Sequence, residues 1–133
     1  MRARPATTAD AAVIARIYND GIDDRVATFE TGHRSADDVE RWFDGRHPIV
    51  VVEYAAREAR GRGAGRMAMN ALMDAARAAG FWKLVSRVFP ENAASLGLLR
   101  SVGFREVGRY ERHAQLDGVW RDVVIVERLL GAG

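Results

Sequence analysis

The feature that most constrains the fold is a glycine-rich segment between an apolar run and a helical pattern. Residues 60–65 read Arg-Gly-Arg-Gly-Ala-Gly; the apolar run 48–53 precedes them and a helical pattern over 65–79 follows. Successive small residues let backbone N–H groups approach an anion, and a helix start adds the positive end of its dipole. The segment therefore predicts either a tight turn or a cradle for a phosphate or pyrophosphate group.

Strands are expected to alternate with helices along the chain. The apolar periodicity predicts helices at about 10–21, 35–45, 65–79 and 92–102, and strands at 2–7, 48–53, 83–89, 104–112 and 120–130. Asp117-Gly118 predicts a hairpin turn between the last two strands. The alternation favours an α/β fold in packed layers, with residues 1–133 forming a single domain.

Composition excludes several kinds of chemistry. The chain of 133 residues has no cysteine, which rules out disulfides, thiolate metal sites and a cysteine acyl-enzyme. No apolar run approaches ~18 residues and no signal-peptide core opens the sequence, so a cytoplasmic location is expected. Charge is uneven, with a net −3 over residues 1–56 and +5 over 57–133. The second half would suit an anionic ligand, although a solvated arginine-rich surface explains the same charge.

Three phosphate-binding patterns compete for the glycine segment. A P-loop requires Lys-Ser or Lys-Thr after its glycines, and the dinucleotide loop requires G-x-G-x-x-G; neither is present. A third pattern, [QR]-x-x-G-x-[GA], is met by Arg60, Gly63 and Gly65. In this pattern the segment resembles the coenzyme A loop of the GNAT family of N-acetyltransferases.

The resemblance extends over nearly all of residues 2–130. The strand 83–89, Asn92 with the helix after it, and Gly103-Phe104 are similar to the second half of the family fold. Further segments resemble the branch that acetylates phosphinothricin, methionine sulfoximine and arsinothricin. They are Arg4-Pro-Ala-Thr7, Ile17-Tyr-Asn19, Ala27-Thr-Phe-Glu30, Gly80-Phe-Trp-Lys83, Phe89-Pro-Glu-Asn92 and Asp117-Gly-Val-Trp-Arg-Asp122.

The resemblance implies a fold and a set of site residues. It implies a mixed central sheet flanked by helices, acetyl-CoA as co-substrate, and a homodimer with Trp120 and Asp122 near the subunit contact and the pocket. It places the amino-acid substrate beside Thr28, Phe29 and Glu30. The residues expected to bind the cofactor are Arg60, Gly61, Arg62, Gly63, Ala64, Gly65, Arg66, Asn92 and Ser95.

Simpler structural roles stay open for several of these residues. Phe29 could plug the core, Asn92 could cap a helix, and Trp120 could pack beside the hairpin turn. His47 and His113 are more typical of structural or exposed histidines than of catalytic bases. No spacing of histidines indicates a metal site, and no metal is expected.

One stretch departs from the family pattern. The resemblance implies two further strands where Glu53 is joined directly to Tyr54, a shortage of roughly 20–30 residues. The resemblance implies that the missing stretch carries the substrate-binding arginines and the general-base glutamate. That glutamate lies four residues before the position of Tyr54, which is Val50 in this sequence, and Leu99 stands where the family has a Tyr or His acid. We favour the explanation that the sequence as read leaves out an internal segment; the alternative is a true deletion, with a gap in the sheet or strand exchange between subunits.

The sequence therefore predicts an acetyl-CoA-dependent N-acetyltransferase acting on a small amino-acid analogue of the phosphinothricin, methionine sulfoximine or arsinothricin type. Direct attack in a ternary complex is expected, and the catalytic base and acid are unassigned. The alternatives are a non-catalytic acyl-CoA-binding or regulatory module, and an acetyltransferase for a different small amine. Nucleic-acid binding is disfavoured because acidic residues interleave with the basic ones; a membrane partner is not expected.

Overall fold

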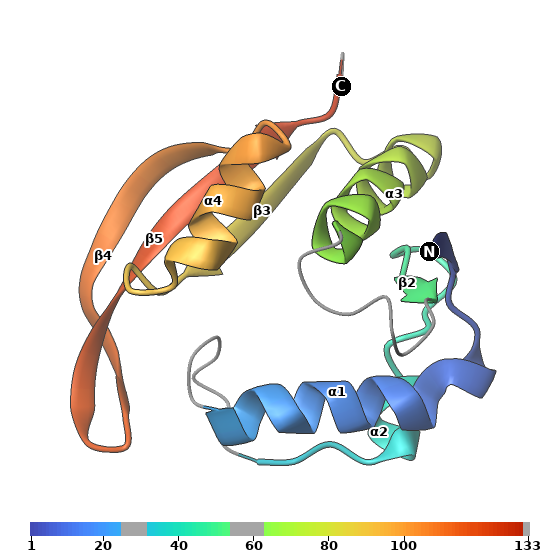
Figure 1. Ribbon diagram of the computed structural model, residues 1–133, viewed down its shortest axis with the longest axis horizontal. Coiled ribbons are helices and arrows are strands. Elements are labelled where there is room, and N and C mark those ends of the chain that lie inside the picture. Colours follow the sequence, from blue (N-terminus) through green and yellow to red (C-terminus); the bar gives the residue numbers. More distant parts are fainter. Residues whose placement is uncertain (25–31, 54–62, 132–133) are drawn as a thin grey trace.

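The computed structural model covers residues 1–133 and describes 1–24, 32–53 and 63–131. Its elements follow the expected alternation of strands and helices (Figure 1). They are β1 (Arg2–Pro5), the 3₁₀ turn η1 (Thr8–Asp10), α1 (Ala11–Asp24), α2 (Ala36–Glu40), β2 (Val50–Glu53), α3 (Ala64–Ala78), β3 (Lys83–Val88), α4 (Ala93–Ser101), β4 (Arg105–Leu116) and β5 (Val119–Leu129).

The described strands form two antiparallel sheets, which confirms the α/β class. One sheet pairs β1 with β2, and the other has the order β3-β5-β4. In Figure 1 the larger sheet lies at the left and β2 at the right, with α3 above β2. The expectation of an omitted internal segment concerns the junction of Glu53 with Tyr54 and stays a prediction. Tyr54, on the far side of that junction, lies outside the described residues.

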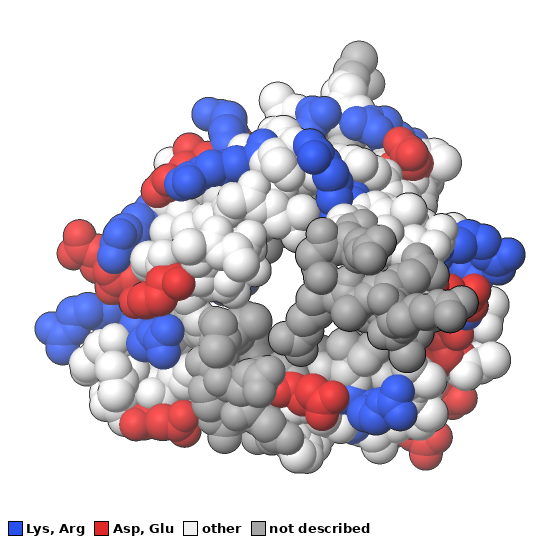
Figure 2. Space-filling model, viewed as in Figure 1, with Lys and Arg blue, Asp and Glu red and all other residues white. Residues whose placement is uncertain are grey.

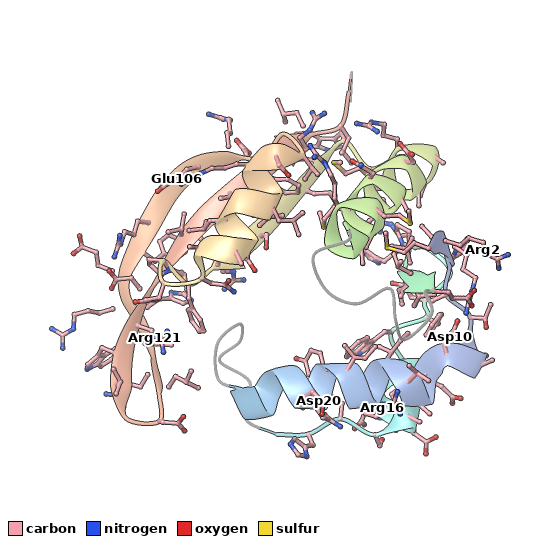
Figure 3. All side chains as sticks on the ribbon, in the orientation of Figure 1. Arg2, Asp10, Arg16, Asp20, Glu106 and Arg121 are labelled. Atoms are coloured by element: carbon pink, nitrogen blue, oxygen red, sulfur yellow. The ribbon has the colours of Figure 1, made fainter. Side chains whose placement is uncertain are left out.

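The small sheet is tied to α1 by charged side chains. Arg4, in β1, donates to both carboxylate oxygens of Asp10 at 2.8 and 2.9 Å and to Glu53 Oε1 at 2.7 Å. The hydrogen bonds from Arg4 and from the Thr7 backbone hold the pKa of Asp10 well below its usual value. Figure 3 shows Arg2 and Asp10 at this same end of the molecule, where β1 leads into the first helix. These contacts fix the direction in which the chain enters α1.

Helices α1 and α2 pack on each other through a small apolar core. Ala11, Ala15 and Val39 are its buried members, with Ile14 and Phe43 packed around them. Ser35 caps α2 by accepting from the Asp38 backbone N–H, and Asp38 returns a bond to the Ser35 backbone. The structure ends α2 at Glu40 rather than near residue 45, so the expected second helix is shorter than predicted.

The main core lies between the larger sheet and two helices. Its buried members come from α3, α4, β3 and β5 and from the residues that directly follow α4 and β5: Met73, Ala76, Val88, Leu96, Leu99, Val102, Phe104, Val124, Val126 and Leu130. The helix predicted over 65–79 is confirmed as α3. Its apolar residues recur every three to four positions, so they share one face of the helix. Both helices therefore lie on the same side of the β3-β5-β4 sheet.

On the other face of this sheet, the buried carboxylate of Glu127 links the three strands. Glu127, in the central strand β5, is only 8% exposed and accepts from Lys83 Nζ at 3.0 Å and from Arg105 Nη2 at 2.6 Å. Lys83 lies in β3 and Arg105 in β4, so one carboxylate joins all three strands. The hydrogen bond from Lys83, and then that from Arg105, lowers the pKa of Glu127 against the opposing effect of burial.

The β4–β5 hairpin turns at Asp117-Gly118, as the sequence predicts. Both residues have positive φ, +51° and +79°, as the favoured two-residue hairpin turn requires. The strand β4 ends at Leu116, four residues beyond its predicted end. Its pairing with β5 shifts register between Tyr110 and Ala114 and then continues to the turn. Asp122 stabilises that shift by accepting from the Arg112 backbone N–H at 2.7 Å and from the Arg109 guanidinium.

Two glycines of α4 and its C-terminus provide opposite tests of this packing. Gly103 has φ +94°, and a Cβ there would lie 2.5 Å from Arg128 Nε, whereas Gly97 is exposed with nothing within 4 Å. We expect Gly103→Ala to lower the free energy of unfolding by about 2 kcal/mol because of left-handed strain and this clash. Gly97→Ala should raise it by up to ~1 kcal/mol through helix propensity. Urea unfolding followed by circular dichroism measures both, and equal shifts for the two variants would contradict the packing described.

The Glu127 bridge predicts a specific dependence of stability on pH. Because its pKa in the folded state is lowered, its stabilising effect is present above the ordinary glutamate pKa and is lost as pH falls through the folded value. Glu127→Gln should therefore lower the urea midpoint clearly at pH 7, and the difference from the unaltered chain should shrink below about pH 4. Glu111→Gln, an exposed change on β4, is the matched control. A difference for Glu127→Gln that stays constant with pH would contradict the assignment.

Candidate functional site

The N-terminus of α3 is built by a left-handed glycine. Gly63 is the N-cap, with φ +83° and ψ +18°, and a Cβ there would meet nothing within 4 Å. Glycine is therefore required by the backbone conformation and not by lack of space. The first helical hydrogen bond runs from the Met67 N–H to the Gly63 carbonyl. The N–H groups of Ala64, Gly65 and Arg66 precede it and lie at the positive end of a 15-residue helix.

Close packing on α4 holds this helix start in place. A Cβ on Gly65 would lie 3.0 Å from Leu98 Cδ2, so the absence of a side chain lets the two helices approach. Arg66 Nη2 donates to the Ser101 carbonyl at 3.0 Å. Arg66, predicted to bind the cofactor, thus braces α3 against the C-terminal end of α4. The sequence alone gave no signal for this contact, since Leu98 and Ser101 lie more than 30 residues away along the chain.

Asn92 begins α4 and takes the capping role that the sequence left open. Its Oδ1 accepts from the Ser95 N–H at 3.1 Å. The side-chain oxygen of Asn92 therefore caps the helix, and its Nδ2 group can still donate a hydrogen bond to another group. Ser95 is half-buried in the first turn of the same helix. Gly65 packs against Leu98, one turn beyond Ser95, which brings the predicted cofactor residues of α3 and α4 onto neighbouring helices.

The remaining predicted binding residues fall outside the described part of the chain. They are Arg60, Gly61 and Arg62 of the glycine segment, and Thr28, Phe29 and Glu30 of the expected substrate loop. The described residues place Gly63, Ala64, Gly65 and Arg66 on α3, and Asn92 and Ser95 at the start of α4. Their roles in binding stay predictions.

The positions expected to hold a base and an acid carry apolar side chains. Leu99 is 7% exposed and belongs to the main core, and Val50 lies half-buried in β2. His47 is exposed and pairs with Asp44 at 2.5 Å. His113 stacks on Tyr110 with ring centroids 5.2 Å apart. These positions supply hydrophobic packing and surface pairs, and they assign no catalytic base.

Trp120 and Asp122, which the resemblance places near the subunit contact, belong to the hairpin. Asp122 holds the irregularity of β4, and the hydrogen bonds from the Arg112 backbone and from Arg109 lower its pKa. Trp120 is 49% exposed, and the Arg112 guanidinium lies 5.2 Å from its ring centroid. Trp120 therefore lies on the surface rather than in the core.

Basic side chains predominate near the helix pair. Figure 2 shows Lys and Arg gathered on the side of the molecule that carries α3, α4 and the larger sheet, with fewer acidic side chains between them. Within the described residues, no group of three or more His, Asp or Glu side chains could hold a metal ion. No helix in the same part of the chain is both long and apolar enough to cross a membrane.

Known proteins similar to this chain are N-acetyltransferases. The L-methionine sulfoximine/L-methionine sulfone acetyltransferase of Pseudomonas paraeruginosa is 29% identical, with 93% of this chain and 91% of the relative covered. The L-amino acid N-acyltransferase MnaT of Escherichia coli is 30% identical over 96% of this chain and 92% of its own length. A phosphinothricin acetyltransferase of Sinorhizobium meliloti, solved with AcCoA, has the same fold: TM-score 0.84, 24% identity, 98% of this chain and 88% of that one covered.

The alignment to the Pseudomonas relative also measures how much this chain lacks. It extends over 157 residues, whereas 93% of a 133-residue chain is only about 124, so about 33 aligned positions have no residue here. That number is close to the two strands and turns that the resemblance implies are absent.

A family-level match completes the identification. Residues 31–104 match the sequence profile described as the Acetyltransferase (GNAT) family, and this range is more than half of the chain. It includes α3, the described end of the glycine segment and α4. Together with the relatives, this match shows that the chain belongs to the acetyltransferase (GNAT) family of N-acetyltransferases.

Proposed function

We propose that the chain acetylates the amino group of a small amino-acid analogue of the methionine sulfoximine, phosphinothricin or arsinothricin type. The observation that carries the proposal is the similarity to a methionine sulfoximine acetyltransferase along 93% of the chain. The chain is an N-acetyltransferase, and acetyl-CoA is the acetyl donor of its family. These analogues are grouped by their chemical likeness: each is an α-amino acid whose side chain ends in a polar tetrahedral head.

The start of α3 supports the proposed position of the cofactor. The N–H groups of Ala64, Gly65 and Arg66 offer donors to the pyrophosphate at the positive end of the helix. We include Arg60, Gly61 and Arg62 in the same cradle. Asn92 would donate its free Nδ2 to the amide-bearing arm of the cofactor, and Ser95 would offer its hydroxyl beside it.

The proposed chemistry is direct transfer within a ternary complex. The neutral substrate amine attacks the thioester carbonyl, a C–N bond forms, the C–S bond breaks, and the proton lost by the amine balances the one gained by the departing thiolate. With no cysteine in the chain, a thiol acyl-enzyme cannot intervene. Thr28, Phe29 and Glu30 would hold the amine, with Glu30 facing its ammonium form before proton loss.

A second function is favoured by the apolar base and acid positions. Val50 and Leu99 cannot transfer a proton, and Leu99 is buried in the core. A module that binds acyl-CoA without turnover would tolerate both residues, and so would an acetyltransferase whose amine arrives neutral. A homodimer and a role in resistance to such analogues also belong to the proposal, because they rest on the resemblance. So does the cytoplasmic location, which is expected from the sequence pattern alone. Nucleic-acid and membrane partners are not part of it.

Release of coenzyme A thiol tests the proposed activity. With acetyl-CoA and L-methionine sulfoximine or phosphinothricin, we expect thiol release matched one to one by N-acetylated product, with kcat/KM on the order of 10⁴ M⁻¹s⁻¹. Calorimetry with acetyl-CoA alone provides the parallel binding measurement. Acetyl-CoA binding without thiol release from any candidate amine would contradict the enzyme and support the binding module.

In the same assay, Asn92→Ser separates cofactor binding from helix capping. Serine also caps helices well, so the stability of the chain should change by less than ~0.5 kcal/mol. The KM for acetyl-CoA should rise by about tenfold, since one hydrogen bond to the cofactor is lost. Asn92→Ala, which removes both functions, is the comparison. An unchanged KM for Asn92→Ser would remove Asn92 from the proposed site.

A further inference from the structure

Two segments that carry the family resemblance, far apart in the sequence, meet in the fold. One is the turn at residues 89–92 between β3 and α4, and the other is the segment 117–122 at the β4–β5 hairpin. Arg121 joins them. Its guanidinium carbon lies 4.5 Å from the centre of the Phe89 ring, and its Nη2 lies 3.3 Å from Glu91 Oε2. Arg121 therefore contacts the turn at two points.

The first of these contacts is made on a buried ring. Phe89 is 3% exposed and packs with Leu116 and Val123 in a small core of its own. Val123 follows Arg121 by two residues in β5, so the two side chains share one face of the strand. Figure 3 shows Arg121 on the hairpin, near the end of β3 from which the chain turns into α4. The strand therefore directs the Arg121 side chain toward this ring.

Asn92 begins α4 with a backbone conformation that differs from an ordinary helix start. Ser35, which caps α2, has the extended ψ of 169° that is typical of N-cap residues, whereas Asn92 has φ −83° and ψ 71°. The Ala93 N–H also donates to the Glu91 carbonyl at 3.0 Å. Asn92 is therefore the central residue of an inverse γ-turn. This turn sets the direction in which the Asn92 side chain leaves the backbone.

The contact of Arg121 with the Phe89 ring is stronger than its ion pair with Glu91. The Glu91 side chain is 65% exposed, and ion pairs of exposed groups contribute little because water screens them. The Arg121 side chain is only 22% exposed, and a cation over an aromatic ring attracts it more strongly when the cation is shielded from water. Loss of the guanidinium should therefore disturb the turn more than loss of the Glu91 charge.

We infer that Arg121 is a positioning residue for acetyl-CoA, acting through the turn that directs Asn92 at the cofactor. The inference rests on the proposed role of Asn92 in the cofactor site. Asn92 Oδ1 accepts from the Ser95 N–H, and a cap of this kind also forms from an extended backbone. A change of ψ at Asn92 would thus redirect Nδ2 while the helix keeps its cap. Arg121, by holding the turn from β5, keeps Nδ2 directed at the cofactor.

Replacement of Arg121 by methionine tests the inference by cofactor binding. Arg121→Met removes the charge and keeps an unbranched apolar side chain over the ring. The Kd for acetyl-CoA, measured by calorimetry, should rise about fivefold because the cation–π contact is lost. In the thiol-release assay the KM for acetyl-CoA should rise in parallel, while kcat changes by less than about twofold. Arg87→Met, at an exposed arginine of β3, is the matched control and should leave the Kd unchanged. Circular dichroism checks that each variant is folded.

A double variant tests whether Arg121 acts through Asn92. Asn92→Ser already removes the Nδ2 donor, so adding Arg121→Met to it should raise the Kd for acetyl-CoA by less than about twofold more. Independent effects would instead multiply, to about fiftyfold for the pair. Glu91→Gln removes only the exposed ion pair and should raise the Kd by less than about twofold.

Amide hydrogen exchange of the cofactor-free chain tests the turn itself. The Ala93 N–H donates to the Glu91 carbonyl, and the Ser95 N–H donates to the Asn92 side chain. In Arg121→Met both amides should exchange at least about threefold faster, because the turn opens more often. The Met67 N–H, which donates to the Gly63 carbonyl at the start of α3, should exchange at the same rate in both chains. This measurement needs neither acetyl-CoA nor turnover.

Equal Kd values for Arg121→Met and Arg87→Met would overturn the inference. So would a multiplied Kd in the double variant, or a raised Kd with unchanged exchange at Ala93 and Ser95, because Arg121 would then act outside the turn. A chain that binds acetyl-CoA but acetylates no candidate amine would contradict the proposed function, and the Kd values would still decide on Arg121. A chain that binds no acetyl-CoA would contradict both.

Discussion

The close approach of α3 to α4 is the constraint on which the functional half of the molecule depends. Gly65 has no side chain where a Cβ would lie 3.0 Å from Leu98, and Arg66 ties the same turn to the Ser101 carbonyl. Behind this contact both helices pack on one face of the β3-β5-β4 sheet. The start of α3 is therefore held by a rigid core, and its N–H groups need no further order to meet an anion.

The sequence predicts this half of the fold well because its patterns are local. The apolar period of α3, the glycine stop at its end and the Asp117-Gly118 turn each lie within a short window, and the structure agrees with each. Contacts between distant residues could not be predicted in the same way. Arg66 with Ser101, and Lys83 and Arg105 with Glu127, depend on which strands and helices become neighbours.

The sequence predicts which residues belong to the candidate site better than it predicts what each of them does in the fold. The glycine segment and Asn92 carry the family resemblance, and the structure gives Gly63, Gly65 and Asn92 structural reasons as well. Left-handed backbone, close helix packing and capping are compatible with cofactor binding, since each leaves donors at a helix start. Arg66 is the exception, because its guanidinium is used within the fold. Leu99, which stands where the resemblance places an acid, is buried and completes the core.

The alignment to the Pseudomonas relative leaves about 33 positions without a residue here, and the family resemblance predicts that the shortage lies between Glu53 and Tyr54, in the other half of the molecule. There the described strands β1 and β2 form a two-stranded sheet of their own, with an apolar groove between that sheet and α1. The half that would bind the cofactor keeps a complete core, whereas the half that would place the amine depends on a small sheet. The proposed cofactor site thus lies on the half with the larger core, and the described residues assign no catalytic base.

Amide hydrogen exchange with and without acetyl-CoA tests the central claim most directly. If the start of α3 is the pyrophosphate cradle, acetyl-CoA should slow exchange of the Ala64, Gly65 and Arg66 amides at least about tenfold. The amides of α1 residues 11–20 should show little change. Protection that spares residues 64–66, with acetyl-CoA bound at saturation, would contradict the account.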